Sequence, residues 1–95
     1  MHNFKEDSRL FRALGDENNL SLLAKLFEGE KEISTIENIS GDIEELSALQ
    51  LVRKREENGR CYIRINKVGK FRAIAILESY LKTRDDIAAC GHEEF

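Results

Sequence analysis

Apolar residues recur at the three-to-four-residue spacing of amphipathic helices through the first part of the chain. A first helix is predicted over about residues 5–14, ending at Gly15. Its apolar positions are Phe4, Leu10, Phe11 and Leu14. Asp16 is the predicted N-cap of a second helix that ends at Gly29. The apolar stripe of this second helix comprises Leu20, Leu22, Leu23, Leu26 and Phe27.

Two short helices are predicted next. Ser34-Thr35-Ile36-Glu37 is a capping-box sequence, which predicts a very short helix through about Ile39. Ser40-Gly41 ends that helix. Asp42 is the predicted N-cap of the next helix, over residues 42–50, and Glu45 completes a second capping-box sequence. The apolar side of this helix comprises Ile43, Leu46 and Leu49.

A longer helix is predicted near the end of the chain, where Asn66 serves as N-cap and the helix runs to about Lys82. Gly69 in its first turn is expected to be mildly unfavourable. Residues 84–95 lack periodicity, so we expect a flexible tail after a single domain over residues 1–83.

This last helix carries more apolar residues than one neighbouring core can cover. They are Val68, Phe71, Ile74, Ala75, Ile76, Leu77, Tyr80 and Leu81. A helix that is apolar on two sides needs two partners, so we expect a homodimer built on the first and last helices. The predicted interface residues are Phe4, Phe11, Phe71, Ile74, Leu77 and Leu81.

Residues 51–65 predict a two-stranded hairpin. Asn58-Gly59 suits a two-residue type I′ turn, in which both central residues take positive φ. With that turn, Arg53 lies opposite Arg64 and Arg55 lies opposite Tyr62. One face then carries Arg53, Arg55, Arg60, Tyr62 and Arg64. The other face carries Val52, Cys61, Ile63 and Ile65, and it needs a core to pack on.

The basic face of the hairpin contrasts with the rest of the chain. Eight cations and two acids lie between Arg53 and Arg72, whereas residues 1–52 contain five cations and eleven acids. Arginines directly opposite one another are unfavourable on their own. This segregated basic face predicts an anionic partner, and nucleic acid is the first candidate. The simpler interpretation is that the face is only a solvated strand surface.

Length and composition limit which classes of protein this chain can belong to. A chain of 95 residues forms one domain with a modest core. No apolar run is long enough to span a membrane and no signal-peptide pattern appears, so we expect a cytoplasmic protein. Two cysteines do not form a disulfide framework. No phosphate-binding loop or nucleophile motif is present, so we expect neither an enzyme nor a cofactor.

A metal site is a weak alternative near the end of the chain. Cys90-Gly91-His92 offers one thiolate and one imidazole, with Asp85, Asp86, Glu93 or Cys61 as possible further ligands. No second cysteine or histidine lies one helical turn away. The simpler interpretation is a polar tail, so no metal is expected.

The order of elements is that of a winged helix-turn-helix domain, mainly α with a small β-hairpin. The segment from Leu10 to Asp16, followed by Leu20-Ser21-Leu22-Leu23, resembles the opening of the arsenic-repressor-like (ArsR-type) transcription regulators. Residues 51–55 and 58–65 resemble the wing of that family. The resemblance spans about residues 8–82. It implies a strand at Ile33-Ser34 and a homodimer. It also implies that the last helix of the helix-turn-helix unit, the reading helix, enters the major groove of DNA, and that the wing contacts phosphates.

The middle of the chain is shorter than in that family, over the turn and the first turn of the reading helix. Asp42, Glu44 and Glu45 stand there instead, and each carboxylate would repel a phosphate. Two functions remain open. One is a dimeric regulator that contacts double-stranded DNA mainly through its basic wing. The other is a winged-helix protein-interaction module that has lost sequence-specific reading of DNA.

Overall fold

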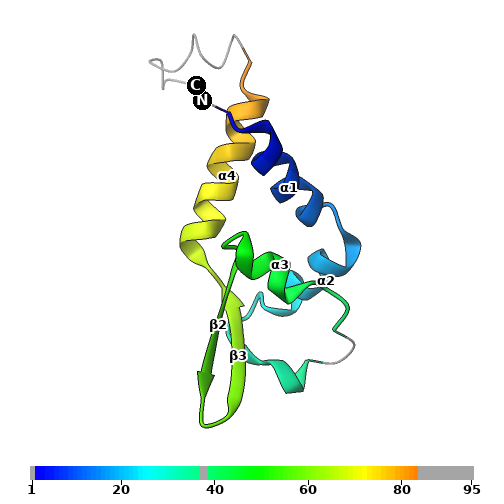
Figure 1. The fold of residues 1–95 in the computed structure, drawn as a ribbon, viewed down its shortest axis with the longest axis vertical. Coiled ribbons are helices and arrows are strands. Elements are labelled where there is room, and N and C mark those ends of the chain that lie inside the picture. The colour runs from blue at the N-terminus through cyan, green and yellow to red at the C-terminus, as the bar shows by residue number, and fades with distance from the viewer. Residues whose placement is uncertain (1, 37–38, 84–95) are drawn as a thin grey trace.

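The computed structural model describes residues 2–36 and 39–83 (Figure 1). The helices are α1 (Phe4–Leu14), α2 (Glu17–Lys25), α3 (Ile43–Ala48) and α4 (Lys67–Leu81), with a 3-10 turn over Ile33–Thr35. The strands are β1 (Lys31–Glu32), β2 (Val52–Glu57) and β3 (Arg60–Ile65), paired antiparallel in the order β1-β3-β2. The predicted architecture, mainly helical with a β-hairpin wing, is confirmed. The predicted tail over residues 84–95 lies outside the described residues.

The two longest helices, α1 and α4, lie side by side near the chain ends, and the hairpin of β2 and β3 projects from the other end of the molecule (Figure 1). Helix α3 lies between them, against the base of the hairpin. The core sits where these elements meet. Its buried apolar residues are Leu10, Ala13, Leu22, Leu26, Ile36, Leu46, Leu51, Val52, Ile63 and Ala73.

The predicted caps of α2 and α3 are confirmed. Asp16 accepts hydrogen bonds from the backbone N–H groups of Asn18 and Asn19, and Asp42 accepts one from Glu45. Asn66 occupies the N-cap position of α4, but its side chain makes no capping hydrogen bond. Its backbone N–H instead donates to the carbonyl of Leu51, at 2.9 Å, and ties α4 to the start of the wing.

The end of α2 differs from the prediction. The helix ends at Lys25, because the N–H groups of Leu26 and Phe27 bond carbonyls three residues back rather than four. This tighter turn directs Phe27 outward, so that it is 90% exposed. Leu20 is also exposed. Two members of the predicted apolar stripe are therefore absent from the core.

The prediction of a helix over residues 34–39 is wrong for residues 34–36 and 39, which the structure describes. Only one 3-10 turn forms, with Glu32 at its N-cap position, and the Thr35 hydroxyl donates to the Glu32 carbonyl at 2.7 Å. Ile36 is extended and buried, because the core takes its side chain. The strand implied at Ile33-Ser34 lies two residues earlier, where Lys31 pairs with Ile63 and Glu32 with Tyr62.

Candidate nucleic-acid interface

The wing has the predicted register. Arg53 pairs with Arg64, Arg55 with Tyr62 and Glu57 with Arg60. The turn residues Asn58 and Gly59 have φ values of 53° and 79°, as a type I′ turn requires. Because side chains alternate along each strand, this register fixes which residues share a face.

The inner face of the wing packs on the core. Ile63 and Val52 are buried, while Ile65 and Cys61 are half-buried. The Cys61 thiol lies 3.5 Å from a carboxylate oxygen of Glu56, and this hydrogen bond, together with burial, raises the pKa of the thiol. The outer face carries the five predicted binding residues. Arg53, Arg55, Arg60 and Arg64 are exposed and Tyr62 is half-buried.

Arg55 is held by acidic residues of its own chain. Its Nε and Nη2 donate to the two carboxylate oxygens of Glu30, at 2.9 and 2.7 Å, and its Nη1 donates to Glu57. The guanidinium also lies over the Tyr62 ring, 4.4 Å from the centroid. These hydrogen bonds lower the pKa of Glu30 and raise that of Arg55. Arg55 is therefore a structural link between the wing and the segment before β1.

The other arginines of the outer face differ in their surroundings. Arg60 lies 3.8 Å from a carboxylate oxygen of Glu32 in β1. Arg53 and Arg64 lie directly opposite each other, and neither makes an ion pair with any residue in the described ranges. Of the four arginines on this face, Arg53 and Arg64 are therefore the two without an ion pair in the described ranges. Arg64 also contributes, after Arg55, to the lowered pKa of Glu30.

The start of α3 is fixed by Asn19, which the sequence did not single out. This buried side chain donates from Nδ2 to the Ala13 carbonyl at 3.0 Å, and its Oδ1 accepts the backbone N–H of Asp42 at 2.7 Å. Asn19 thus joins the end of α1 to the N-cap of α3. No local signal separates it from its exposed neighbour Asn18, so only the tertiary contact reveals its role.

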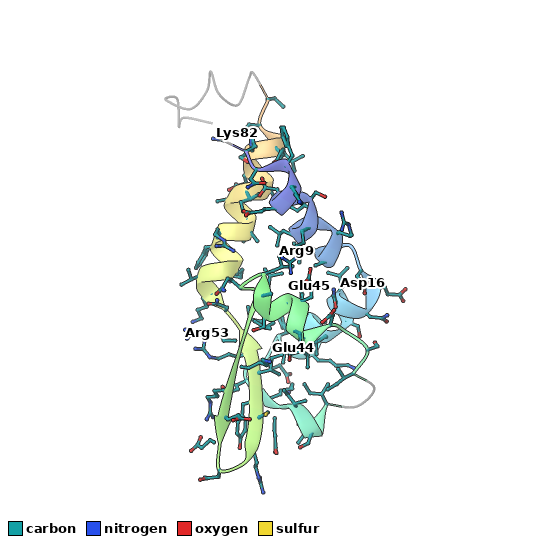
Figure 2. All side chains as sticks on the ribbon, in the orientation of Figure 1. Arg9, Asp16, Glu44, Glu45, Arg53 and Lys82 are labelled. Atoms are coloured by element: carbon teal, nitrogen blue, oxygen red, sulfur yellow. The ribbon has the colours of Figure 1, made fainter. Side chains whose placement is uncertain are left out.

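The carboxylates of α3 are paired within the chain. Arg9 of α1 donates through Nε and Nη2 to both oxygens of Glu45, at 2.9 and 2.7 Å. Lys54 of β2 donates to Glu44 at 2.7 Å. Figure 2 shows Arg9 and Glu45 meeting between α1 and α3, with Arg53 on the side of the wing away from α3. Two of the three acids expected to repel phosphates are therefore partly neutralised.

The Arg9–Glu45 pair predicts a pH dependence of stability. Hydrogen bonds from Arg9 lower the pKa of Glu45 below its ordinary value of 4.5. A carboxyl whose pKa falls on folding contributes stability above the pKa of the unfolded state and loses it as the pH falls through the folded-state pKa. The deficit in unfolding free energy of Glu45→Gln relative to wild type should be larger at about pH 7 than at about pH 3.

Urea denaturation at the two pH values measures this difference. In an Arg9→Met background the pH-dependent part should disappear, because the partner of Glu45 is gone. A deficit that is the same at both pH values would contradict the stabilising role of the ion pair.

Helix α4 has an inner and an outer face. Ala73 is buried on the inner face, and Tyr80 there donates its hydroxyl to Asp7 of α1 at 2.6 Å. Burial, followed by the hydrogen bond to Asp7, raises the pKa of Tyr80 to about 12. The Phe11 ring meets the Tyr80 ring edge-on, with 5.8 Å between centroids. These contacts hold α1 against α4.

The outer face of α4 is apolar and exposed. It carries Val68, Phe71, Ile74, Leu77 and Leu81, and Phe4 of α1 is exposed as well. Of the six predicted interface residues, five are therefore accessible to a partner. Phe11 is half-buried and packs within its own chain. Their contact with a second copy stays a prediction.

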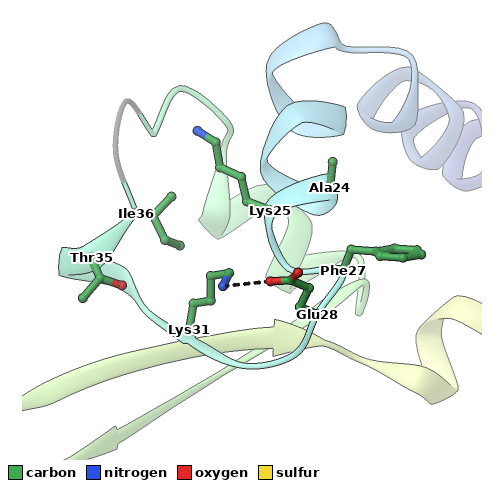
Figure 3. Close-up of a pocket in the computed structure, with 7 residues that line it drawn as sticks. All are labelled: Ala24, Lys25, Phe27, Glu28, Lys31, Thr35 and Ile36. Carbon is green, nitrogen blue, oxygen red and sulfur yellow. Dashed lines mark ion pairs between the residues drawn. The ribbon is translucent and has the colours of Figure 1, made fainter.

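A hollow of about 610 Å³ lies beside β1, where the chain leaves α2 (Figure 3). Its lining includes the ion pair between Glu28 and Lys31, at 4.0 Å, and the exposed ring of Phe27. The seven residues drawn in Figure 3 include no histidine or cysteine. This surface shows no constellation suited to acid–base or nucleophilic chemistry.

Metal sites and membrane-spanning helices are two further features to compare with the predictions. Within residues 2–36 and 39–83, no group of three or more histidine, cysteine or acidic side chains is placed to hold a metal ion. The candidate ligands Cys90 and His92 lie outside the described residues. No helix of the described chain is long and apolar enough to cross a membrane.

Neither a family model nor a curated protein matches the sequence. Solved structures with similar folds include an ArsR family transcriptional regulator, with a TM-score of 0.66 and 17% identity over 84% of this chain and 90% of the other. The M. tuberculosis protein Rv0081 has a TM-score of 0.59 and 18% identity over 82% of this chain and 91% of its own.

A third structure is the homodimeric winged helix-turn-helix DNA-binding domain of a possible ArsR-family regulator from Mycobacterium bovis. Its TM-score is 0.58 at 21% identity, and the match covers 100% of this chain and 97% of the other. At these identities the similarity concerns the fold. The chain has the winged helix-turn-helix fold that is found in ArsR-type transcription regulators.

Proposed function

We propose that the protein is a DNA-binding transcription regulator that contacts the phosphate backbone mainly through Arg53 and Arg64 of its wing. The observation that carries the proposal is the position of these two arginines, opposite each other on the exposed face and outside the ion pairs that occupy Arg55 and Arg60. Such a like-charged pair is unfavourable alone and becomes favourable beside an anion.

The contribution of α3 is proposed to be small. The helix has six residues, and Glu44 and Glu45 on it are engaged by Lys54 and Arg9. A helix this short offers few side chains to base edges, where sequence is read. Affinity for DNA would then be largely electrostatic, with weak discrimination between sequences.

We further propose that the active form is a homodimer joined through the outer face of α4 and Phe4 of α1. An exposed apolar row along a helix is the usual mark of an interface. The Mycobacterium bovis domain of similar fold is homodimeric. Two copies would present two wings to one duplex, which doubles the number of phosphate contacts. A DNA-binding role also favours a location in the cytoplasm. We propose no catalytic activity for the protein.

The test is the salt dependence of binding to a labelled duplex of mixed sequence. Arg53→Ala/Arg64→Ala should lower the magnitude of the slope of log affinity against log salt by about 0.9 per lost phosphate contact, or about 3.6 for the four arginines of a dimer. The loss should be similar for unrelated sequences, because phosphates carry no sequence information. Fluorescence anisotropy at several salt concentrations measures both quantities.

A matched control removes two cations from elsewhere. Lys5→Ala/Lys82→Ala changes the net charge equally. Lys82 lies at the end of the molecule away from the wing (Figure 2), and Lys5 lies in the first turn of α1, which begins near that same end (Figure 1). This variant should keep most of the wild-type slope. Equal slopes for the wing variant and wild type would contradict the proposed contact.

The second candidate is a protein-interaction module. It is favoured by one observation, the short α3 whose acidic side chains are held within the chain rather than presented to a groove. If wild type binds no duplex at low salt, the wing arginines have no phosphate to meet and this candidate takes precedence.

A further inference from the structure

A cavity of about 570 Å³ lies where α2, the end of β3 and α4 come together. Its volume falls within the range of about 300–1,000 Å³ that is typical of small-molecule sites. Most of its lining is aliphatic. The aliphatic residues of the lining include Leu14, Leu23, Leu26, Leu51, Ile65 and Ile74. They come from α1, from α2 and the turn after it, from the residue before β2, from β3 and from α4.

The polar part of the lining is cationic. Arg64 of β3 and Lys67 and Lys70 of α4 all line the cavity. Glu30 is the one acid among the described residues that line it, and both of its carboxylate oxygens accept hydrogen bonds from Arg55. Its charge is therefore largely compensated, and the three cations set the electrostatic potential of the cavity mouth.

We propose that this cavity binds an amphipathic carboxylate, with the apolar body against the leucine and isoleucine side chains and the carboxylate at Arg64, Lys67 and Lys70. The two parts of the lining complement the two parts of such a ligand. An apolar molecule without charge would give the three cations no anionic partner, and a small anion without an apolar body would leave the aliphatic surface exposed to water. The Lys70 ammonium lies 5.0 Å from the centroid of the Phe71 ring, which leaves it accessible to a carboxylate.

The site also links the ligand to the wing. Arg64 lines the cavity and is one of the two arginines proposed to contact phosphate. A bound carboxylate and a phosphate would compete for the same guanidinium, so each lowers the affinity for the other by the same factor. This coupling rests on the proposed function, whereas binding of the carboxylate itself does not.

Isothermal titration calorimetry with octanoate tests the site directly, without DNA. Octan-1-ol is the comparison ligand, since it has the same chain length and no charge. Octanoate should bind at least about tenfold more tightly than the alcohol, because it gains hydrogen bonds between charged groups. Lys67→Ala/Lys70→Ala should remove most of this preference, with little change in fold by circular dichroism, since both lysines are exposed.

Lys5→Ala/Lys82→Ala is the matched variant, with the same change in charge and neither residue in the lining. It should bind octanoate within about twofold of wild type, since exposed charges beyond a Debye length are screened. Equal binding of octanoate and octan-1-ol, or no binding of either, would overturn the proposal. Ile74 lines the cavity and also lies on the face of α4 proposed for the homodimer, so the titration is repeated below and above the concentration at which the dimer forms. An octanoate affinity that falls as the dimer forms would also overturn the proposal, because the second copy would then cover the cavity.

The coupling is read separately, by adding octanoate to the protein–duplex complex. A fall in DNA affinity of about tenfold at saturating octanoate supports the shared use of Arg64. If octanoate binds tightly and the DNA affinity does not change, the proposed coupling is overturned, whereas the proposed carboxylate site is supported. Absence of DNA binding would contradict the proposed function, and the calorimetry would still decide the site.

Discussion

Gly69→Ala should unfold the protein or lower its unfolding free energy by about 3 kcal/mol or more, because overpacking against rigid surroundings is among the larger single-residue effects. A Cβ at position 69 would lie 1.5 Å from the carbonyl oxygen of Gln50 and 2.6 Å from its carbonyl carbon. Both are backbone atoms, so no rotamer change relieves the clash. The first turn of α4 would have to separate from the end of α3.

The sign of this effect is opposite to helix propensity. Replacing glycine by alanine inside a helix normally gains about 1 kcal/mol. The melting temperature of Gly69→Ala should instead fall by more than about 12 °C, at about 4 °C or more per kcal/mol for a domain of this size. Differential scanning calorimetry or circular dichroism measures it.

Two controls distinguish the close approach from a general effect. Ala75→Gly, on the exposed side of α4, should lose only about 1 kcal/mol, as propensity predicts. Gln50→Ala should not rescue Gly69→Ala, since the obstructing atoms belong to the backbone. A Gly69→Ala protein as stable as wild type would show that the α3–α4 contact is looser than described.

The contrast at Gly69 shows which parts of the fold are predictable. The wing turn, the Asp16 cap and the Asp42 cap depend on residues within four positions of one another, and these predictions are confirmed. The need for glycine at 69 arises from Gln50, and the extended form of Ile36 arises from the core. Helical propensity and capping patterns carry no information on such tertiary constraints.

In the candidate site, too, local patterns were predictable and tertiary contacts were not. Alternation along the strands placed the arginines on one face, and the register confirms that placement. Their partners could not be predicted, because sequence gives charge but not distance. Glu30 engages Arg55 from another segment, and Arg9 and Lys54 engage the acids of α3. Of the four arginines on the outer face, Arg53 and Arg64 are left without an ion pair in the described ranges, and the binding role of the face stays a prediction.

Leu77→Glu should dissociate the proposed homodimer. Leu77 lies on the outer face of α4 and is 45% exposed in the single chain, so a second copy is needed to cover it. In a dimer with twofold symmetry the change occurs twice in one interface. Because Leu77 is only 45% exposed, the partner buries about half of each side chain, and losing two such burials at about 0.7–1.3 kcal/mol each weakens association by about 1.4–2.6 kcal/mol, or roughly 10- to 100-fold. The desolvation of two glutamate carboxylates in the interface adds to this loss.

Light scattering at tens of micromolar separates the two states by mass. The matched control is Leu20→Glu on α2, since Leu20 is 49% exposed and lies outside the proposed interface. It introduces the same charge at a leucine of nearly equal exposure, and it should leave the dimer intact. A wild-type protein with the mass of one chain would contradict the assembly outright.

The same pair of variants tests whether DNA binding needs two wings. A dimer holds its second wing near the duplex once the first is bound, which makes the second contact intramolecular. Leu77→Glu should therefore bind duplex DNA more weakly than wild type, and the magnitude of its salt slope should fall by about half, because half of the phosphate contacts are lost. Leu20→Glu should match wild type in both quantities. A monomeric Leu77→Glu with an unchanged salt slope would mean that one wing accounts for all the phosphate contacts, and the proposed regulator would then bind DNA as a single chain.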